Sequence, residues 1–137
     1  MAFRPPTHRD RTWVKRVIAL PGDRVAVRDN QVYLNGKKLE RDPVPAASLS
    51  AIKRQARDEV FYETNAGSRY MVMLGAEPGG SDFAERSVPE GHCFLLGDNR
   101  DNSTDSRVPQ TARGVGFVPF EDLVGRADRV MFSSAGR

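Results

Sequence analysis

Residues 31–40, QVYLNGKKLE, hold the clearest local signal in the sequence: two short strand-forming stretches on either side of the pair Asn35-Gly36. Asn-Gly is favoured in two-residue hairpin turns because both central positions need positive φ angles. Upstream, residues 24–28 (RVAVR) alternate apolar and charged side chains, and Pro21-Gly22-Asp23 supplies turn chemistry before them. We therefore predict a run of antiparallel strands that begins with Trp13–Leu20 and continues through this hairpin.

The rest of the chain also consists mainly of short predicted strands separated by turns. Further strands are predicted at residues 60–64, 68–74, 92–96 and 127–133, with a turn at 120–126. The first twelve residues carry two prolines and predict a loop or an edge segment. Residues 46–56 have helix formers with weak periodicity, which allows one short helix. Seven or eight short strands joined by turns predict an all-β, mainly β fold with little helix, in a single domain over residues 1–137.

Composition narrows the functional classes. The net charge is +3, from 21 Lys and Arg against 18 Asp and Glu, and the basic residues are scattered without interleaved aromatics, so nucleic-acid binding is not expected. No stretch approaches the ~18 apolar residues of a membrane span. The lone Cys93 can form no internal disulfide and is expected to be a small buried hydrophobe. His8 and His92 lie far apart in sequence, and no metal or cofactor is predicted.

A lysine stands within the first predicted strand, in residues 13–23, WVKRVIALPGD. Side chains alternate between the two faces of a strand, so Lys15 shares a face with Val17 and Ala19. One interpretation is an edge strand that carries a charge against aggregation. The other is a desolvated lysine whose pKa falls from ~10.4 towards neutrality. A neutral amine of that kind can accept a proton from a serine hydroxyl.

Residues 97–107, GDNRDNSTDSR, form the second unusual segment, with three Asp, two Asn, two Ser, one Thr and two Arg. A solvated surface loop is one interpretation. A calcium loop is another, but no Gly stands at the sixth position, two arginines oppose a cation and no Glu closes the loop. The third is a salt-bridge network that holds the loop rigid. In that case Asp98, Arg100, Asp105 and Arg107 should include at least one close ion pair.

These two segments resemble motifs of a known family. KRVIALPGD (residues 15–23) and GDNRDNSTDSR are similar to two motif boxes of bacterial type I signal peptidases, the serine–lysine proteases that trim leader peptides from exported proteins. Residues 114–127, GVGFVPFEDLVGRA, resemble the stretch after the second box. The likeness runs from about Phe3 to Ser133, although residues 44–90 match only by position and β-character. It implies a coiled β-sheet or partly open barrel with little helix.

The resemblance implies roles for individual side chains. Lys15 matches the general base, and Ser103 matches the hydroxyl that bonds to the lysine and orients it, so the two should lie close together. Gly97 matches the small residue that lets the loop pack against the lysine. Ion pairs that support the site are implied for Arg16, Asp98, Asp105 and Arg107.

The resemblance also implies a substrate. Thr12, Trp13 and Val14 fall where the family binds the substrate backbone as an added strand, beside shallow pockets for small side chains at the first and third residues before the cut. The expected partners are the signal peptides of preproteins. For the full-length protein, the expected location is the inner membrane, with this domain on the periplasmic face.

One feature departs from the family pattern. The family's nucleophilic serine lies tens of residues before the lysine, whereas only fourteen residues precede Lys15 here and none is serine. The family's membrane anchor is likewise missing from residues 1–137. The sequence therefore predicts a catalytic-type β-domain that carries the base without the nucleophile segment and is inactive alone. A non-catalytic peptide-binding paralogue and a conjugation-linked peptidase of the same superfamily remain alternatives.

Overall fold

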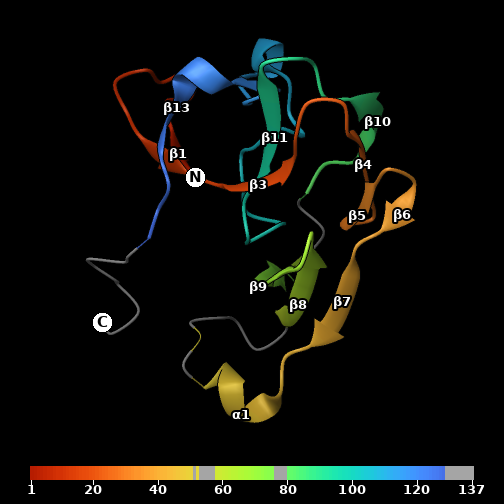
Figure 1. The fold of residues 1–137 in the computed structure, drawn as a ribbon. Helices are drawn as coiled ribbons and strands as arrows, with labels where there is room; N and C mark the ends of the chain where they lie inside the picture. The colour runs from red at the N-terminus through yellow and green to blue at the C-terminus, as the bar shows by residue number, and fades with distance from the viewer. Residues whose placement is uncertain (51, 53–57, 76–79, 129–137) are drawn as a thin grey trace.

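The structure, a computed structural model, describes residues 1–50, 52, 58–75 and 80–128. Over these residues the protein is mainly β, and the expected all-β class with little helix is confirmed (Figure 1). The strands are β1 (Ala2–Phe3), β2 (Trp13–Val14), β3 (Arg16–Ala19), β4 (Arg24–Arg28), β5 (Gln31–Leu34), β6 (Lys37–Lys38), β7 (Glu40–Pro43), β8 (Glu59–Asn65), β9 (Ser68–Leu74), β10 (Phe83–Ser87), β11 (His92–Leu96), β12 (Val118–Pro119) and β13 (Leu123–Gly125). The helical segments are α1 (Ala46–Leu49) and two single 3-10 turns, Gln110–Ala112 and Phe120–Asp122.

Within the described residues, the strands form four small antiparallel sheets. Their orders are β13-β1-β2, β10-β4-β5-β6, β12-β11-β3 and β7-β8-β9. Figure 1 shows the last of these, with α1 beyond it, extending away from the body that the other three sheets form. The predicted hairpin at Asn35-Gly36 is present, with φ angles of 52° and 80° at the two turn residues.

Strand β11 divides the core in two. Its last four residues, CFLL, are a buried apolar run because both faces of the strand are covered. Phe94 and Leu96 face a cluster built mainly from β3, β4, β5 and β9, whereas Cys93 and Leu95 face a second cluster with Phe3, Val115 and Val118. The lone cysteine is therefore buried, as expected of a small hydrophobe. The fold places β3, which also pairs with β11, between the same two clusters.

Five local expectations need correction. The turn predicted at 120–126 is a 3-10 turn over Phe120–Asp122 followed by strand β13 over Leu123–Gly125. Trp13–Leu20 is two strands, because β2 pairs with β1 and β3 pairs with β11, so β3 does not continue into the β4-β5-β6 meander. Strand β1 is central rather than an edge, since it has β13 on one side and β2 on the other. Strand β10 was not anticipated. A strand was predicted at 127–133, but residues 127 and 128 are not in a strand and 129–133 lie outside the described residues.

Across the described residues, no helix has the length and apolarity needed to cross a membrane.

Candidate active site

Lys15 occupies the junction between two sheets. Val14, before it, pairs with Ala2 of β1, and Arg16, after it, pairs with Leu96 of β11. The backbone of Lys15 itself bonds to that of Met1 in both directions, at 3.1 and 2.8 Å. The change of partner interrupts the strand at this one residue and leaves the lysine side chain half-buried.

The Lys15 side chain reaches the polar loop. Its Nζ donates a hydrogen bond to Oγ of Ser103 at 2.7 Å, so the predicted proximity of these two residues is confirmed. Gly97 makes this approach possible, because a Cβ at that position would lie 2.0 Å from Ser103 Oγ and 3.3 Å from Lys15 Nζ. The indole ring of Trp13 is also close, with its centroid 5.9 Å from Nζ.

Burial lowers the pKa of Lys15. Removal of water from the ammonium is the largest cause; the charges of Asp105 and Asp98 act in the opposite direction, and that of Arg107 adds to the lowering. Of the two interpretations of this lysine, a desolvated amine agrees with the geometry better than an edge charge that points into solvent.

The loop from Gly97 to Arg107 is held in place by an ion pair between two of its own residues. Both carboxylate oxygens of Asp105 accept bonds from Arg107, from Nε and Nη2 at 2.9 Å each, and both side chains are almost fully buried. Asp105 also accepts a bond from the Gly97 backbone N–H at 3.1 Å. The expectation of a close ion pair in this loop is confirmed, and the backbone beside Lys15 is tied to that pair.

The second predicted ion pair lies at the surface. Arg16 donates two bonds to Asp98, from Nε at 2.8 Å and from Nη2 at 2.9 Å, and both side chains are partly exposed. The Arg16 guanidinium also lies 4.0 Å from the centre of the Tyr70 ring. Arg16 therefore connects β3 to the start of the loop and to strand β9.

Sequence reasoning assigned no role to two buried residues, Arg100 and Glu63. Arg100 is 1% exposed and forms an ion pair with Glu63, which is 0% exposed, at 2.6 Å. Arg100 belongs to the quoted motif, but its partner comes from β8, where no motif was recognised. The available signal was a carboxylate in a strand of aromatic and β-branched residues, a place where an unpaired charge is disfavoured.

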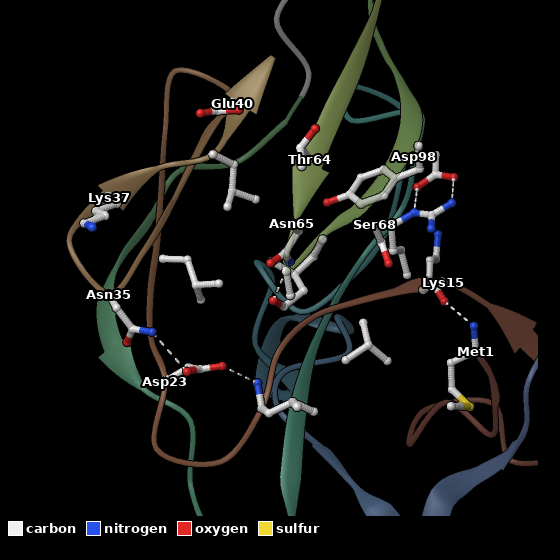
Figure 2. A pocket seen from close by; sticks show the side chains of 18 of the residues that line it. Met1, Lys15, Asp23, Asn35, Lys37, Glu40, Thr64, Asn65, Ser68 and Asp98 are labelled. Atoms are coloured by element: carbon white, nitrogen blue, oxygen red, sulfur yellow. Dashed lines mark hydrogen bonds and ion pairs between the residues drawn. The ribbon is translucent and has the colours of Figure 1, made fainter. Parts of the chain in front are cut away.

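Two hollows meet near the lysine. A groove of about 1160 Å³ follows β3, and Figure 2 shows Lys15 and Asp98 on one side of it and Lys37 and Asn35 on the other. A smaller hollow, of about 380 Å³, is lined by Trp13, Val14, Lys15, Asn102, Ser103 and Thr104.

The three residues expected to bind substrate differ in their placement. Trp13 and Val14 form β2, which stands at the edge of its sheet, and the Val14 side chain is 60% exposed. Thr12 is exposed and lies just before the strand. The edge of β2 thus runs directly to the Lys15–Ser103 pair.

Comparison with known proteins decides the family. Residues 1–132 match the family model described as signal peptidase, peptidase S26. The chain belongs to this signal peptidase family. It is 36% identical over 141 residues to signal peptidase I of Rickettsia akari and 37% identical over 141 residues to that of Rickettsia rickettsii. Each alignment covers 98% of this chain and 50% of the relative. The chain spans about half the length of these curated signal peptidases.

A solved signal peptidase has the same fold. The crystal structure of a signal peptidase I from Enterococcus faecalis V583 matches with a TM-score of 0.52 and 30% identity, over 93% of this chain and 91% of that one. The sequence resemblance to signal peptidases and the predicted fold are both confirmed by these matches.

Proposed function

We propose that this chain is the base-carrying part of a signal peptidase I, a serine endopeptidase that removes signal peptides from exported preproteins. The observation that carries the proposal is the half-buried Lys15, whose pKa is lowered and whose Nζ is bonded to Ser103 in a member of this family. A lysine amine works as a general base only when it is neutral near the working pH, and desolvation favours that form.

The proposed reaction is acyl transfer through a serine. Neutral Nζ of Lys15 takes the proton of a serine hydroxyl as its oxygen attacks the carbonyl carbon of the scissile peptide. The ammonium then gives that proton to the leaving amine as the C–N bond breaks, and an acyl-serine remains. A water molecule, deprotonated by the same amine, attacks the ester and releases the carboxylate and the free serine.

The proposed nucleophile is a serine outside residues 1–137. No serine precedes Lys15 in this sequence. Ser103 has a different position: its hydroxyl is held against the backbone of Gly97 and accepts the bond from Lys15. We assign it the role of orienting the amine. Gly97, Asp105 and Arg107 hold the loop behind it, and the pair of Arg16 and Asp98 fixes the start of β3, directly after the lysine.

The proposed substrate is an extended peptide that pairs with β2. The edge of this strand offers backbone N–H and C=O groups for an added strand, which is the general mode of β-augmentation. The hollow beside Trp13, Val14 and Ser103 is small, which suits small side chains next to the cut. By extension, the full-length protein would lie at the inner membrane with this domain on its outer face, where signal peptides emerge.

The test is cleavage of a leader peptide whose cleavage site is Ala-x-Ala. We expect residues 1–137 alone to be inactive, and a longer form that includes the codons upstream of Met1 to cleave after the second Ala. Lys15→Ala should abolish that cleavage, because the base is lost.

Two outcomes would contradict the proposal. Cleavage by residues 1–137 that disappears in both Lys15→Ala and Ser103→Ala would make Ser103 the nucleophile. Binding of the leader peptide without cleavage in every form would favour a non-catalytic peptide-binding protein, because the free edge of β2 serves that function equally well.

A further inference from the structure

Strand β8 contributes a fully buried carboxylate to the region behind the lysine. Glu63 is 0% exposed. Its Oε1 accepts bonds from Tyr70 Oη at 2.9 Å and Arg100 Nη2 at 2.6 Å, and its Oε2 accepts from Arg41 Nε at 3.0 Å and Arg100 Nη1 at 3.2 Å. Burial acts to raise the pKa of Glu63, but the bonds and charge of Arg100, helped by Arg41, outweigh it and hold the pKa low. Glu63 is therefore an anion surrounded by donors.

Arg100 transmits this anchoring to the loop. While its two terminal nitrogens hold Glu63, its Nε donates to the carbonyl oxygen of Gly97 at 3.0 Å. The N–H of Gly97 is already bonded to Asp105. The peptide groups on both sides of Gly97 are thus fixed by buried charged side chains, at the position where a Cβ would overlap Ser103.

A second route leads from Glu63 to the next residue of the loop. The Tyr70 hydroxyl donates a hydrogen bond to Glu63, and the Tyr70 ring lies 4.0 Å from the guanidinium of Arg16. That guanidinium in turn donates to Asp98. Strand β9 supports the same place through its backbone, since Met73 N–H donates to the Asp98 carbonyl at 2.8 Å. Both routes end at adjacent residues, Gly97 and Asp98.

We propose that Glu63 is a positioning residue, which acts through Arg100 and Tyr70 to hold Gly97 and Asp98 so that Ser103 stays against Lys15. Its relevance to catalysis rests on the proposed function, because Lys15 is the base only there. The carboxylate is needed because the guanidinium of Arg100 is oriented by two bonds to one anion. Without that anion Arg100 keeps a buried charge without compensation and turns towards water, which releases the Gly97 carbonyl.

The test measures the titration of Lys15 directly. The chain has four lysines, at positions 15, 37, 38 and 53, so a sample labelled with ¹³C-lysine gives four side-chain signals, and Lys15→Arg identifies the one of interest. In Glu63→Gln we expect the pKa of Lys15 to rise by about half a pH unit or more, because a loosened loop readmits water and burial is the main cause of the lowering.

The direction in which the pKa of Lys15 changes distinguishes a positioning role of Glu63 from a direct effect of its charge. Loss of a nearby negative charge disfavours an ammonium, so the charge change alone would lower the pKa of Lys15. Val72→Ala is the matched control for general loosening, since Val72 is buried in the neighbouring strand β9 and does not contact Arg100 through a hydrogen bond. It should lower the urea midpoint of unfolding and leave the Lys15 titration unchanged.

A second variant covers the case in which Glu63→Gln fails to fold. Glu63→Leu with Arg100→Met removes the two fully buried charges together, a change that buried ion pairs often tolerate. Arg41, whose side chain is 12% exposed, loses Glu63 but keeps its bond to the Asn30 carbonyl oxygen. The double variant should fold, and the pKa of Lys15 should still rise, because no side chain donates to the Gly97 carbonyl.

The proposal is overturned if the Lys15 titration is unchanged or moves downward in Glu63→Gln or in the double variant, or if Val72→Ala produces the same rise. These results would leave the proposed peptidase function untouched. Conversely, a wild-type Lys15 that titrates at its ordinary value near 10.5 would remove the support for Lys15 as base, whatever Glu63 does.

Discussion

Nζ of Lys15 lies 2.7 Å from Oγ of Ser103, although 88 positions of sequence separate the two residues. One partner is placed by the change of sheet between β2 and β3. The other is placed by a loop whose backbone is bonded to buried aspartate and arginine side chains. The contact therefore depends on the whole arrangement rather than on either segment alone, and it can be tested from several sides.

The buried lysine should make stability depend on pH. Because the pKa of Lys15 is lowered from 10.5 in the folded state, the unfolded chain binds more protons at this residue between the two pKa values. Folded-state stability contributed by Lys15 is thus lost as pH falls through the lowered pKa, and is fully present above 10.5. Lys15→Met has no such titration. We expect urea unfolding from pH 7 to 11 to show that the unfolding free energy of the wild type rises with pH relative to that of the variant. If the two proteins have the same dependence of unfolding free energy on pH, a lowered pKa is contradicted.

A methyl group at position 97 should disrupt the site. In Gly97→Ala the new Cβ would lie 2.0 Å from Ser103 Oγ, so the loop must move, at a cost of about 1–3 kcal/mol in unfolding free energy. Gly125→Ala is the matched control, because nothing lies within 4 Å of a Cβ there. Equal stability of the two variants in urea would show that the loop yields easily and that close packing at Gly97 is unimportant.

The two ion pairs of the loop should differ strongly in their contribution to stability. Asp105→Asn leaves the buried guanidinium of Arg107 without its anion, and we expect it to lower the unfolding free energy by about 3–5 kcal/mol. Asp98→Asn affects a partly exposed pair with Arg16 and should cost at most about 1 kcal/mol. Chemical denaturation of both variants makes the comparison. An Asp98 variant as unstable as the Asp105 variant would contradict this ranking.

The lone cysteine should be unreactive in the folded protein. Burial raises the pKa of Cys93 to about 11, and its thiol is 1% exposed, so neither the thiolate nor access is available near pH 8. An aromatic disulfide reagent should label less than a tenth of the protein within the time that suffices for full labelling in urea. Rapid labelling without urea would show that the second core cluster opens readily.

The sequence was most informative where local chemistry suffices. The Asn35-Gly36 turn and strands β9 and β11 were predicted with correct bounds, because turn residues and apolar runs mark them. Strand β10, with the sequence FAERS, has one large apolar residue and depends on its pairing with β4. The split of the strand at Lys15 follows from partners that are distant in sequence. A local pattern contains no information about such pairings.

The candidate site divides in the same way. The motif around Gly97 and Ser103 pointed to Lys15 by resemblance to signal peptidases, and the proximity was then found, whereas the catalytic roles remain a prediction. Glu63 was missed because its importance lies in a partner 37 positions away. Its own neighbours in sequence show only a polar residue in a strand, which is ordinary.

The close packing of Gly97 on Ser103 constrains how these positions can evolve. Every other amino acid has a Cβ, and at position 97 it would lie 2.0 Å from the Ser103 oxygen and 2.5 Å from the Ser103 Cβ. Even alanine at position 103 would still overlap, so only a glycine there would make room. A lineage could therefore exchange the two residues only by passing through an ancestor with glycine at both positions. Drift at these two positions is coupled, and a descendant should be free to lose Gly97 only after glycine has replaced Ser103.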